Sequence, residues 1–106
     1  MRKQQQARKK LQAARYAACR ANETAYAARR LDDAHHNHRY WEGWWRWTVK
    51  QVNAAQQARE IVDGADAVYA EANQLELDGL AALEEFKAGR KPVCVGRPLP
   101  ASAWSV

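Results

Sequence analysis

Small apolar residues recur in the first part of the chain at alternating intervals of four and three. The members of this seam are Ala7, Leu11, Ala14, Ala18, Ala21, Ala25 and Ala28. Such spacing is the heptad pattern of a helix that packs against a neighbour along a narrow stripe. It predicts a long first helix, which we place at about residues 2–39.

A second seam with the same alternation begins shortly after the middle of the chain. Its members are Ala54, Ala58, Ile61, Ala65, Val68, Ala72, Leu75, Gly79, Ala82 and Phe86. It predicts a second helix over about residues 44–88, with a local kink at Asp63–Gly64 and a stop at Gly89.

A reversal near Gly43 would make the two seams coincide, because residue i of the first helix then faces roughly residue 86−i of the second. We therefore expect an all-α protein, a long antiparallel helical hairpin in residues 1–89 with the packing of an alanine-rich coiled coil. The alternative is one continuous helix through Gly43, since a glycine inside a helix costs only about 1 kcal/mol.

Charge divides the chain and favours the same register. The net charge is +8 over residues 1–50, −5 over residues 51–90 and +2 over residues 91–106. In the hairpin the bases Arg8, Lys10 and Arg15 come within about one turn of Asp78, Glu76 and Glu71. We expect the two halves to neutralise each other. The alternative is that the basic half contacts nucleic acid, with the candidate residues Arg8, Lys9, Lys10, Arg15, Arg46 and Lys50.

The core of such a hairpin is thin. Leu, Ile, Val and Phe together supply 16 of the 106 residues, whereas alanine alone supplies 22. The second helix is also apolar beyond its seam, at Tyr69 and Leu83 among others, so one partner helix cannot cover it. These features predict protein partners in a larger assembly, or a homo-oligomer.

Four tryptophans cluster where the reversal is expected, within residues 40–47. One interpretation is a hydrophobic plug that closes the end of the hairpin. The other is a docking end, because tryptophan and arginine are enriched in interface hot spots.

The last seventeen residues, 90–106, differ in composition from the rest, since they hold all three prolines and no acidic residue. They predict an extended tail that lies along the surface of a partner, with Leu99 and Trp104 among its anchors.

No catalytic signature is present, so we expect neither an enzyme nor a cofactor. The residues Asp32, Asp33, His35, His36 and His38 lack a second ligand set on the opposing helix, so no metal site is expected either.

Cys19 and Cys94 are 75 residues apart and are expected to be free thiols in an intracellular reducing compartment, either the cytoplasm or an assembled particle. The first 22 residues contain no acid, which leaves mitochondrial import as the alternative. A membrane partner is not expected, because the chain has no apolar run of 18 residues.

The residues Trp41-Glu42-Gly43 stand near the middle of the chain, between the two predicted helices. This pattern resembles the central W-x-G turn of the small helical-hairpin proteins exported by type VII secretion systems, and the resemblance covers residues 7–88. It implies a secreted, non-enzymatic hairpin that dimerises, with Trp41 and Gly43 in the turn.

The sequence as a whole favours a non-catalytic structural or assembly subunit of a multi-component complex. It would bind proteins through the aromatic turn, the apolar face of the second helix and the tail. The predicted partner-binding residues are Trp41, Trp44, Trp45, Arg46, Trp47, Tyr69, Leu83, Leu99 and Trp104. The two alternatives are a nucleic-acid-contacting protein and the secreted hairpin described above.

Overall fold

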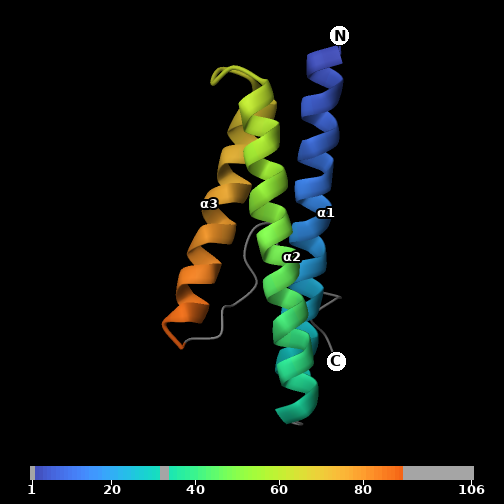
Figure 1. Ribbon diagram of the computed structural model, residues 1–106, viewed down its shortest axis with the longest axis vertical. Helices are drawn as coiled ribbons and strands as arrows, with labels where there is room; N and C mark the ends of the chain where they lie inside the picture. The colour runs from blue at the N-terminus through green and yellow to red at the C-terminus, as the bar shows by residue number, and fades with distance from the viewer. Residues whose placement is uncertain (1, 32–33, 90–106) are drawn as a thin grey trace.

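The computed structural model describes residues 2–31 and 34–89, with the backbone alone for residues 34–36. It contains three helices, α1 (Arg2–Arg30), α2 (Ala34–Ile61) and α3 (Ala67–Lys87). They run side by side, with α1 and α3 pointing one way and α2 the other (Figure 1). The predicted all-α class is confirmed, and the described residues contain no strand.

The chain first reverses between Arg30 and Ala34, and Gly43 lies inside α2. The predicted pair of helices with a turn near Gly43 is therefore wrong. Gly43 faces α1, since a Cβ placed there would be in van der Waals contact with Thr24, 3.4 Å from its Cγ2.

The position of this reversal follows from where the α1 seam ends. After Ala28 the next two heptad positions are Asp32 and His35, which are polar. If the helix continued past this point, its packing face would contain these polar residues, so packing against a neighbour would no longer stabilise it.

The predicted kink at Asp63–Gly64 is a second reversal, since α2 ends at Ile61 and α3 begins at Ala67. Asp66 caps α3, because its carboxylate accepts a hydrogen bond of 2.8 Å from the backbone N–H of Val68. The continuous-helix alternative is excluded by these reversals.

The predicted stop of the last helix at Gly89 is confirmed. Helix α3 ends at Lys87, and Gly89 adopts a φ of 84°, a left-handed conformation that glycine tolerates best. Its N–H donates to the Phe86 carbonyl at 3.0 Å, as in a helix C-cap.

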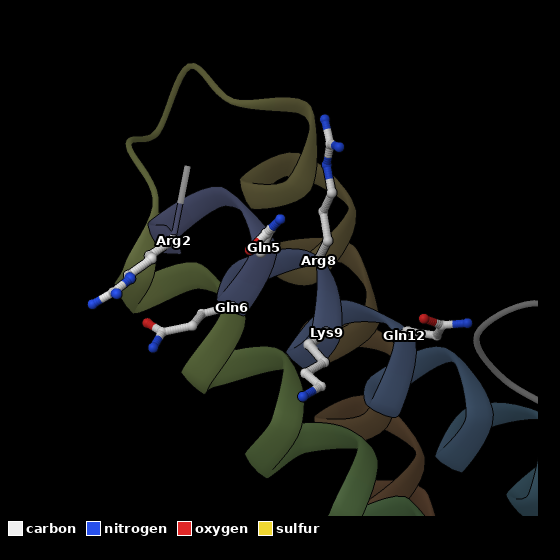
Figure 2. Close-up of a pocket in the computed structure, with 6 residues that line it drawn as sticks. All are labelled: Arg2, Gln5, Gln6, Arg8, Lys9 and Gln12. Atoms are coloured by element: carbon white, nitrogen blue, oxygen red, sulfur yellow. The ribbon is translucent and has the colours of Figure 1, made fainter.

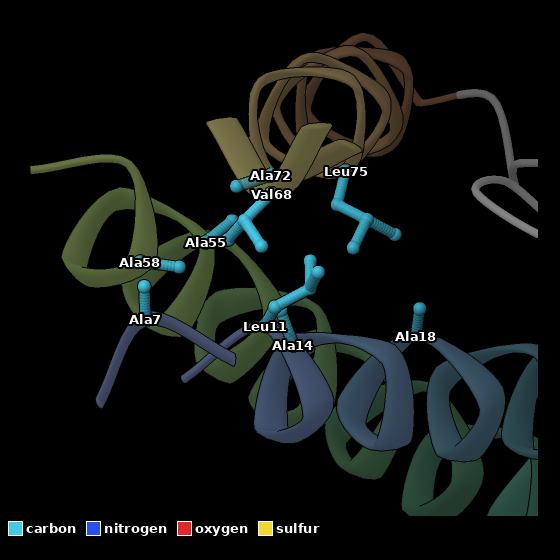
Figure 3. Packing of buried hydrophobic residues seen from close by; sticks show 9 residues of the cluster. All are labelled: Ala7, Leu11, Ala14, Ala18, Ala55, Ala58, Val68, Ala72 and Leu75. Atoms are coloured by element: carbon cyan, nitrogen blue, oxygen red, sulfur yellow. The ribbon is translucent and has the colours of Figure 1, made fainter. Parts of the chain in front are cut away.

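The alanine seam of α1 is buried along its whole length, as its spacing predicts. Its first half packs against both other helices in one cluster (Figure 3). The buried members of this cluster are Ala7, Leu11, Ala14, Ala18, Ala55, Ala58, Val68, Ala72 and Leu75. The second half of the seam packs mainly against large aromatic rings of α2, so small side chains on one helix face large ones on the next.

The predicted register, in which residue i faces residue 86−i, is wrong because α1 and α3 run in the same direction. Leu11 and Leu75 do share a cluster. Ala25, however, belongs to the aromatic cluster, whereas its predicted partner Ile61 packs against the other one.

The contact between α2 and α3 is unusually close at Gly79. Gln51 is fully buried there, and its Nε2 donates a hydrogen bond of 2.6 Å to the Leu75 carbonyl in the α3 backbone. A Cβ at Gly79 would lie 2.6 Å from Val52 Cγ2 and 3.3 Å from Gln51 Nε2. The missing side chain at Gly79 therefore makes room for Val52 and Gln51 of α2.

This contact gives a stability test. We expect Gly79→Ala to lower the free energy of unfolding in chemical denaturation, because overpacking costs about 1–3 kcal/mol while helix propensity returns at most about 1 kcal/mol. Gly64→Ala is the control, since no atom lies closer than 3.9 Å to its added Cβ. Gly79→Ala combined with Val52→Ala should regain part of the loss. A Gly79→Ala protein as stable as the parent would contradict the packing described here.

Candidate functional site

The tryptophan cluster is largely part of the core. Trp41 and Trp44 are only 5% and 0% exposed, and the Trp44 ring lies 5.3 Å from the Phe86 ring, centroid to centroid. The sequence predicts both as partner-binding residues, and in the folded chain both rings are buried in the core. They lie on one side of α2, which faces α1 and α3, because the helix continues through Gly43 instead of turning there. The turn that the W-x-G resemblance implied is also absent at this position.

The other predicted partner-binding residues are spread over the molecule. Trp45, Trp47, Tyr69 and Leu83 are half-buried, and Arg46 is exposed. Trp45 packs against Phe86 with a centroid distance of 5.6 Å, so it also belongs with the core rings. Leu99 and Trp104, with the rest of the predicted tail, lie outside the described residues. The members of this set that the structure describes do not form a single docking end.

The first ten residues of α1, by contrast, present a dense group of exposed bases. The group comprises Arg2, Lys3, Arg8, Lys9 and Lys10. Among the described residues, none of the five has a carboxylate oxygen within 4.0 Å. Arg2 and Lys3 lie in the first turn of α1, at the positive end of the helix dipole, and no acidic residue precedes Glu23. These two charges disfavour the start of the helix unless an anion lies nearby.

Three hollows connect these bases to the surface of α2. The first is formed by α1 alone and is lined by Arg2, Gln5, Gln6, Arg8, Lys9 and Gln12. Figure 2 shows Arg2 and Gln6 pointing to one side of the helix and Gln12 to the other, with Lys9 between them. The second hollow shares Gln6 and Lys9 with the first, and adds Lys10, Ala13 and Ile61.

The third hollow lies between α1 and α2 and shares Ala13 with the second. Its lining residues are Ala13, Tyr16, Ala17, Trp47, Lys50, Asn53, Ala54 and Gln57. We call the three hollows together the basic groove. None of its lining residues is acidic.

Trp47 is the centre of the aromatic part of the basic groove. The Tyr16 ring meets it edge to face, with centroids 5.6 Å apart and planes at 81°. Two cations lie over the Trp47 ring, the Arg20 guanidinium at 5.6 Å and the Lys50 ammonium at 4.7 Å. Such cation–π contacts hold the basic groups at a defined place beside the aromatic surface.

Seven of the twelve acidic residues lie on α3 or on the α2–α3 connection, and two of them form ion pairs with bases of α1 and α2. Arg15 forms a two-armed ion pair with Glu71, in which Arg15 Nη2 donates to Glu71 Oε1 at 2.8 Å. This hydrogen bonding raises the pKa of Arg15. Arg59 of α2 pairs with the buried Glu76. Of the ion pairs expected from the hairpin register, Arg15–Glu71 is the one that the described residues show.

Asp66 provides a second link to α1, where Gln4 Nε2 donates to its carboxylate at 2.8 Å. That hydrogen bond, the one from the Val68 N–H and the nearby Arg8 charge hold the pKa of Asp66 below its ordinary value of 3.8. Asp66 thus remains charged at neutral pH, and the residue of α1 to which it is hydrogen-bonded is the neutral Gln4. Arg15 is thus paired with an acid of α3, whereas the five bases at the start of α1 have no carboxylate oxygen within 4.0 Å among the described residues.

The predicted nucleic-acid contacts are partly brought together. Lys9, Lys10 and Lys50 line the basic groove, and Arg8 lines its first hollow. Arg15 instead lines a separate depression between α1 and α3, with Cys19 and Leu75. Arg46 is exposed but lines none of these hollows.

Sequence reasoning missed Tyr16, Arg20, Asn53 and Gln57 as candidates. The signal was present in the spacing, since Lys50, Asn53 and Gln57 recur at three and four and so share one face of a helix. That face becomes part of a hollow only because α1 packs against it. Predicting the hollow therefore requires knowing that the chain reverses between Arg30 and Ala34.

The described residues contain no group of three potential metal ligands, and His38 pairs with Glu42 at 3.1 Å. The side chains of Asp32, Asp33, His35 and His36 lie outside the described ones. The Cys19 thiol is free and half-buried, and Cys94 is not among the described residues.

In the described part of the chain, no helix combines the length and apolar character needed to cross a bilayer. Comparison with known proteins gives no match, whether to a protein-family model, a curated protein or a solved structure.

The core position of Trp44 gives a test that separates structure from binding. Trp44→Ala should lower the free energy of unfolding by about 3–5 kcal/mol, because it removes a fully buried aromatic ring. Trp44→Phe should cost much less, since it keeps a ring in place and removes an indole N–H that has no acceptor in the described structure. Thermal and urea denaturation provide the measurement. A Trp44→Ala protein with unchanged stability would place this ring at the surface.

Proposed function

We propose that the protein is a non-catalytic subunit that binds nucleic acid through the basic groove. The observation that supports this proposal is that three neighbouring hollows, which share Gln6, Lys9 and Ala13, bring bases of α1 and Lys50 of α2 to one surface without an acidic lining residue. Lysine and arginine that neutralise phosphates release condensed counterions, and this release supplies most of the affinity for nucleic acid.

The distribution of charge favours a polymer over a small anion. The bases extend along α1 from Arg2 to Arg20, a distance of about 27 Å at 1.5 Å per residue. A phosphate chain can contact many of them at once, whereas a single phosphate group can contact only a few. The acidic α3 helix then restricts binding to the side of the molecule that carries the groove.

A nucleic acid also suits the groove better than an anionic lipid surface does. Amphipathic helices that insert into headgroups carry large aliphatic or aromatic residues on the inserted face. Here the α1 part of the groove presents glutamines, two alanines and bases, and Tyr16 is its one aromatic residue.

A second candidate function is the assembly subunit that binds other proteins, as the sequence analysis favours. The specific observation is an exposed apolar face on α3, where Leu77 and Leu80 are 52% and 42% exposed. Asp78 and Glu84 border these leucines, so the matching partner would be an apolar helix flanked by basic residues, from another protein or from a second copy. Large exposed apolar side chains next to one another are typical of protein interfaces.

The remaining expectations stay predictions. Export as a W-x-G hairpin depends on three residues that lie within α2. An intracellular reducing compartment agrees with the free Cys19 thiol and with a nucleic-acid partner, and mitochondrial import remains the alternative to it. Coiled-coil packing of the α1 seam agrees with its unbroken burial.

The nucleic-acid proposal is tested by the salt dependence of binding to a fluorescently labelled oligonucleotide. We expect log K to fall linearly with log[salt], and Lys9→Ala and Lys50→Ala each to reduce the slope by about one. Lys87→Ala on α3 is the matched control and should leave the slope unchanged, because Lys87 lies outside the groove.

Two results would contradict the proposal. The first is binding that Lys9→Ala and Lys50→Ala affect no more than Lys87→Ala does, which would make the leucine face of α3 the stronger candidate. The second is tighter binding to phosphatidylserine vesicles than to the oligonucleotide at equal phosphate concentration, which would identify a lipid headgroup as the source of the phosphate.

A further inference from the structure

The third hollow of the basic groove differs from the other two because it is aromatic and amide-lined as well as basic. It has a volume of about 320 Å³. Three alanines, Ala13, Ala17 and Ala54, leave open space between α1 and α2, and Tyr16 and Trp47 supply the rings beside it. A purely electrostatic phosphate site needs neither of these rings.

Tyr16 is the ring in this hollow that is available to a ligand. It is 59% exposed, the largest value among the exposed large apolar side chains of the described residues. The edge-to-face contact with Trp47 orients the Tyr16 ring, and Trp47 is itself held by Arg20 and Lys50. An exposed ring that is held in one orientation binds a flat partner at a low cost in conformational entropy.

The polar lining suits a nucleobase. Asn53 and Gln57 are exposed on α2 and are one turn apart, and each side-chain amide offers both a donor and an acceptor. Amides of this kind bind the edges of unpaired bases, while aromatic rings stack on their faces. Lys50 lines the hollow, and its ammonium lies 4.7 Å from the Trp47 ring centroid, where it can meet the phosphate next to a stacked base. Arg20 lies over the same ring but forms an ion pair with Glu23 at 2.8 Å.

We propose that the third hollow binds one unpaired base of a single-stranded nucleic acid, stacked on Tyr16 and with a neighbouring phosphate on Lys50. This inference rests on the proposed nucleic-acid function and specifies the substrate class. In a duplex the faces of each base are covered by the neighbouring bases, so Tyr16 would find no free base face on which to stack. A single strand exposes those faces, and base–aromatic stacking is tolerant of sequence.

The test compares a labelled twenty-nucleotide oligothymidine with a labelled duplex of equal length, using the full chain and fluorescence anisotropy. We expect the single strand to bind more tightly, and Tyr16→Ala to weaken its binding by about 5- to 150-fold, the loss of one stacking contact. The slope of log K against log[salt] should stay the same, because Tyr16→Ala removes no phosphate contact. Duplex binding should not change either.

Two controls separate stacking from folding. Tyr16→Phe keeps the ring and should keep single-strand affinity within about twofold of the parent. Leu80→Ala removes an exposed apolar side chain on α3, outside the groove, and should have no effect. Circular dichroism of every variant should match the parent, since Tyr16 is more than half exposed.

The outcomes distinguish this inference from the proposed function. Equal, salt-dependent binding of both oligonucleotides that Tyr16→Ala does not change would overturn the stacking site and leave the basic groove as a general phosphate surface. Salt-independent binding, or no binding of either oligonucleotide, would overturn both. Weaker binding by Tyr16→Phe as well as Tyr16→Ala would assign the effect to the hydroxyl group and contradict stacking.

Discussion

The contact between the alanine seam of α1 and the tryptophan-bearing face of α2 is the interaction on which the rest of the structure depends. Ala21, Ala25 and Ala28 are buried against Trp41 and Trp44, so area that alanine cannot bury is supplied by the indole rings opposite. This pairing of small with large side chains occurs in the register in which Thr24 lies over Gly43. It explains how a chain with few aliphatic residues forms a core, and why the helix continues through a glycine.

The same register creates the candidate site. Reversal after Arg30 lays the middle of α1 beside the middle of α2, and Tyr16 then meets Trp47. With the reversal at Gly43 these residues would have lain far apart, and the lysines of the two helices would have formed no common surface. Five of the twelve acidic residues lie on α3 and two on the α2–α3 connection. Among the described residues, the five bases at the start of α1 have no carboxylate oxygen within 4.0 Å, so this basic face is open to an anionic partner.

Part of this arrangement can be read from the sequence, and the physical reason for the limit is specific. The α1 seam is predictable because alanine and leucine keep the heptad spacing without a gap. The seam of α2 keeps the same spacing from Trp41 through Trp44 to Ala58, but it passes through the polar Thr48 and Gln51. Both are fully buried, but because they are polar the sequence does not mark them as core positions of a seam. The bases Lys9 and Lys50 are predictable singly, whereas their common surface with Tyr16 follows from the fold alone.

The most direct test of this account is a cross-link between α1 and α2. With Cys19 and Cys94 replaced by serine, Thr24→Cys and Gly43→Cys should form an intramolecular disulfide on mild oxidation, because a Cβ at position 43 lies 3.4 Å from Thr24 Cγ2. The expected result is monomeric protein that has lost both thiols. If the chain reversed at Gly43, positions 24 and 43 would be about 28 Å apart along one helix. Retention of both thiols, or exclusively dimeric product, would contradict the register from which the fold and the basic groove both follow.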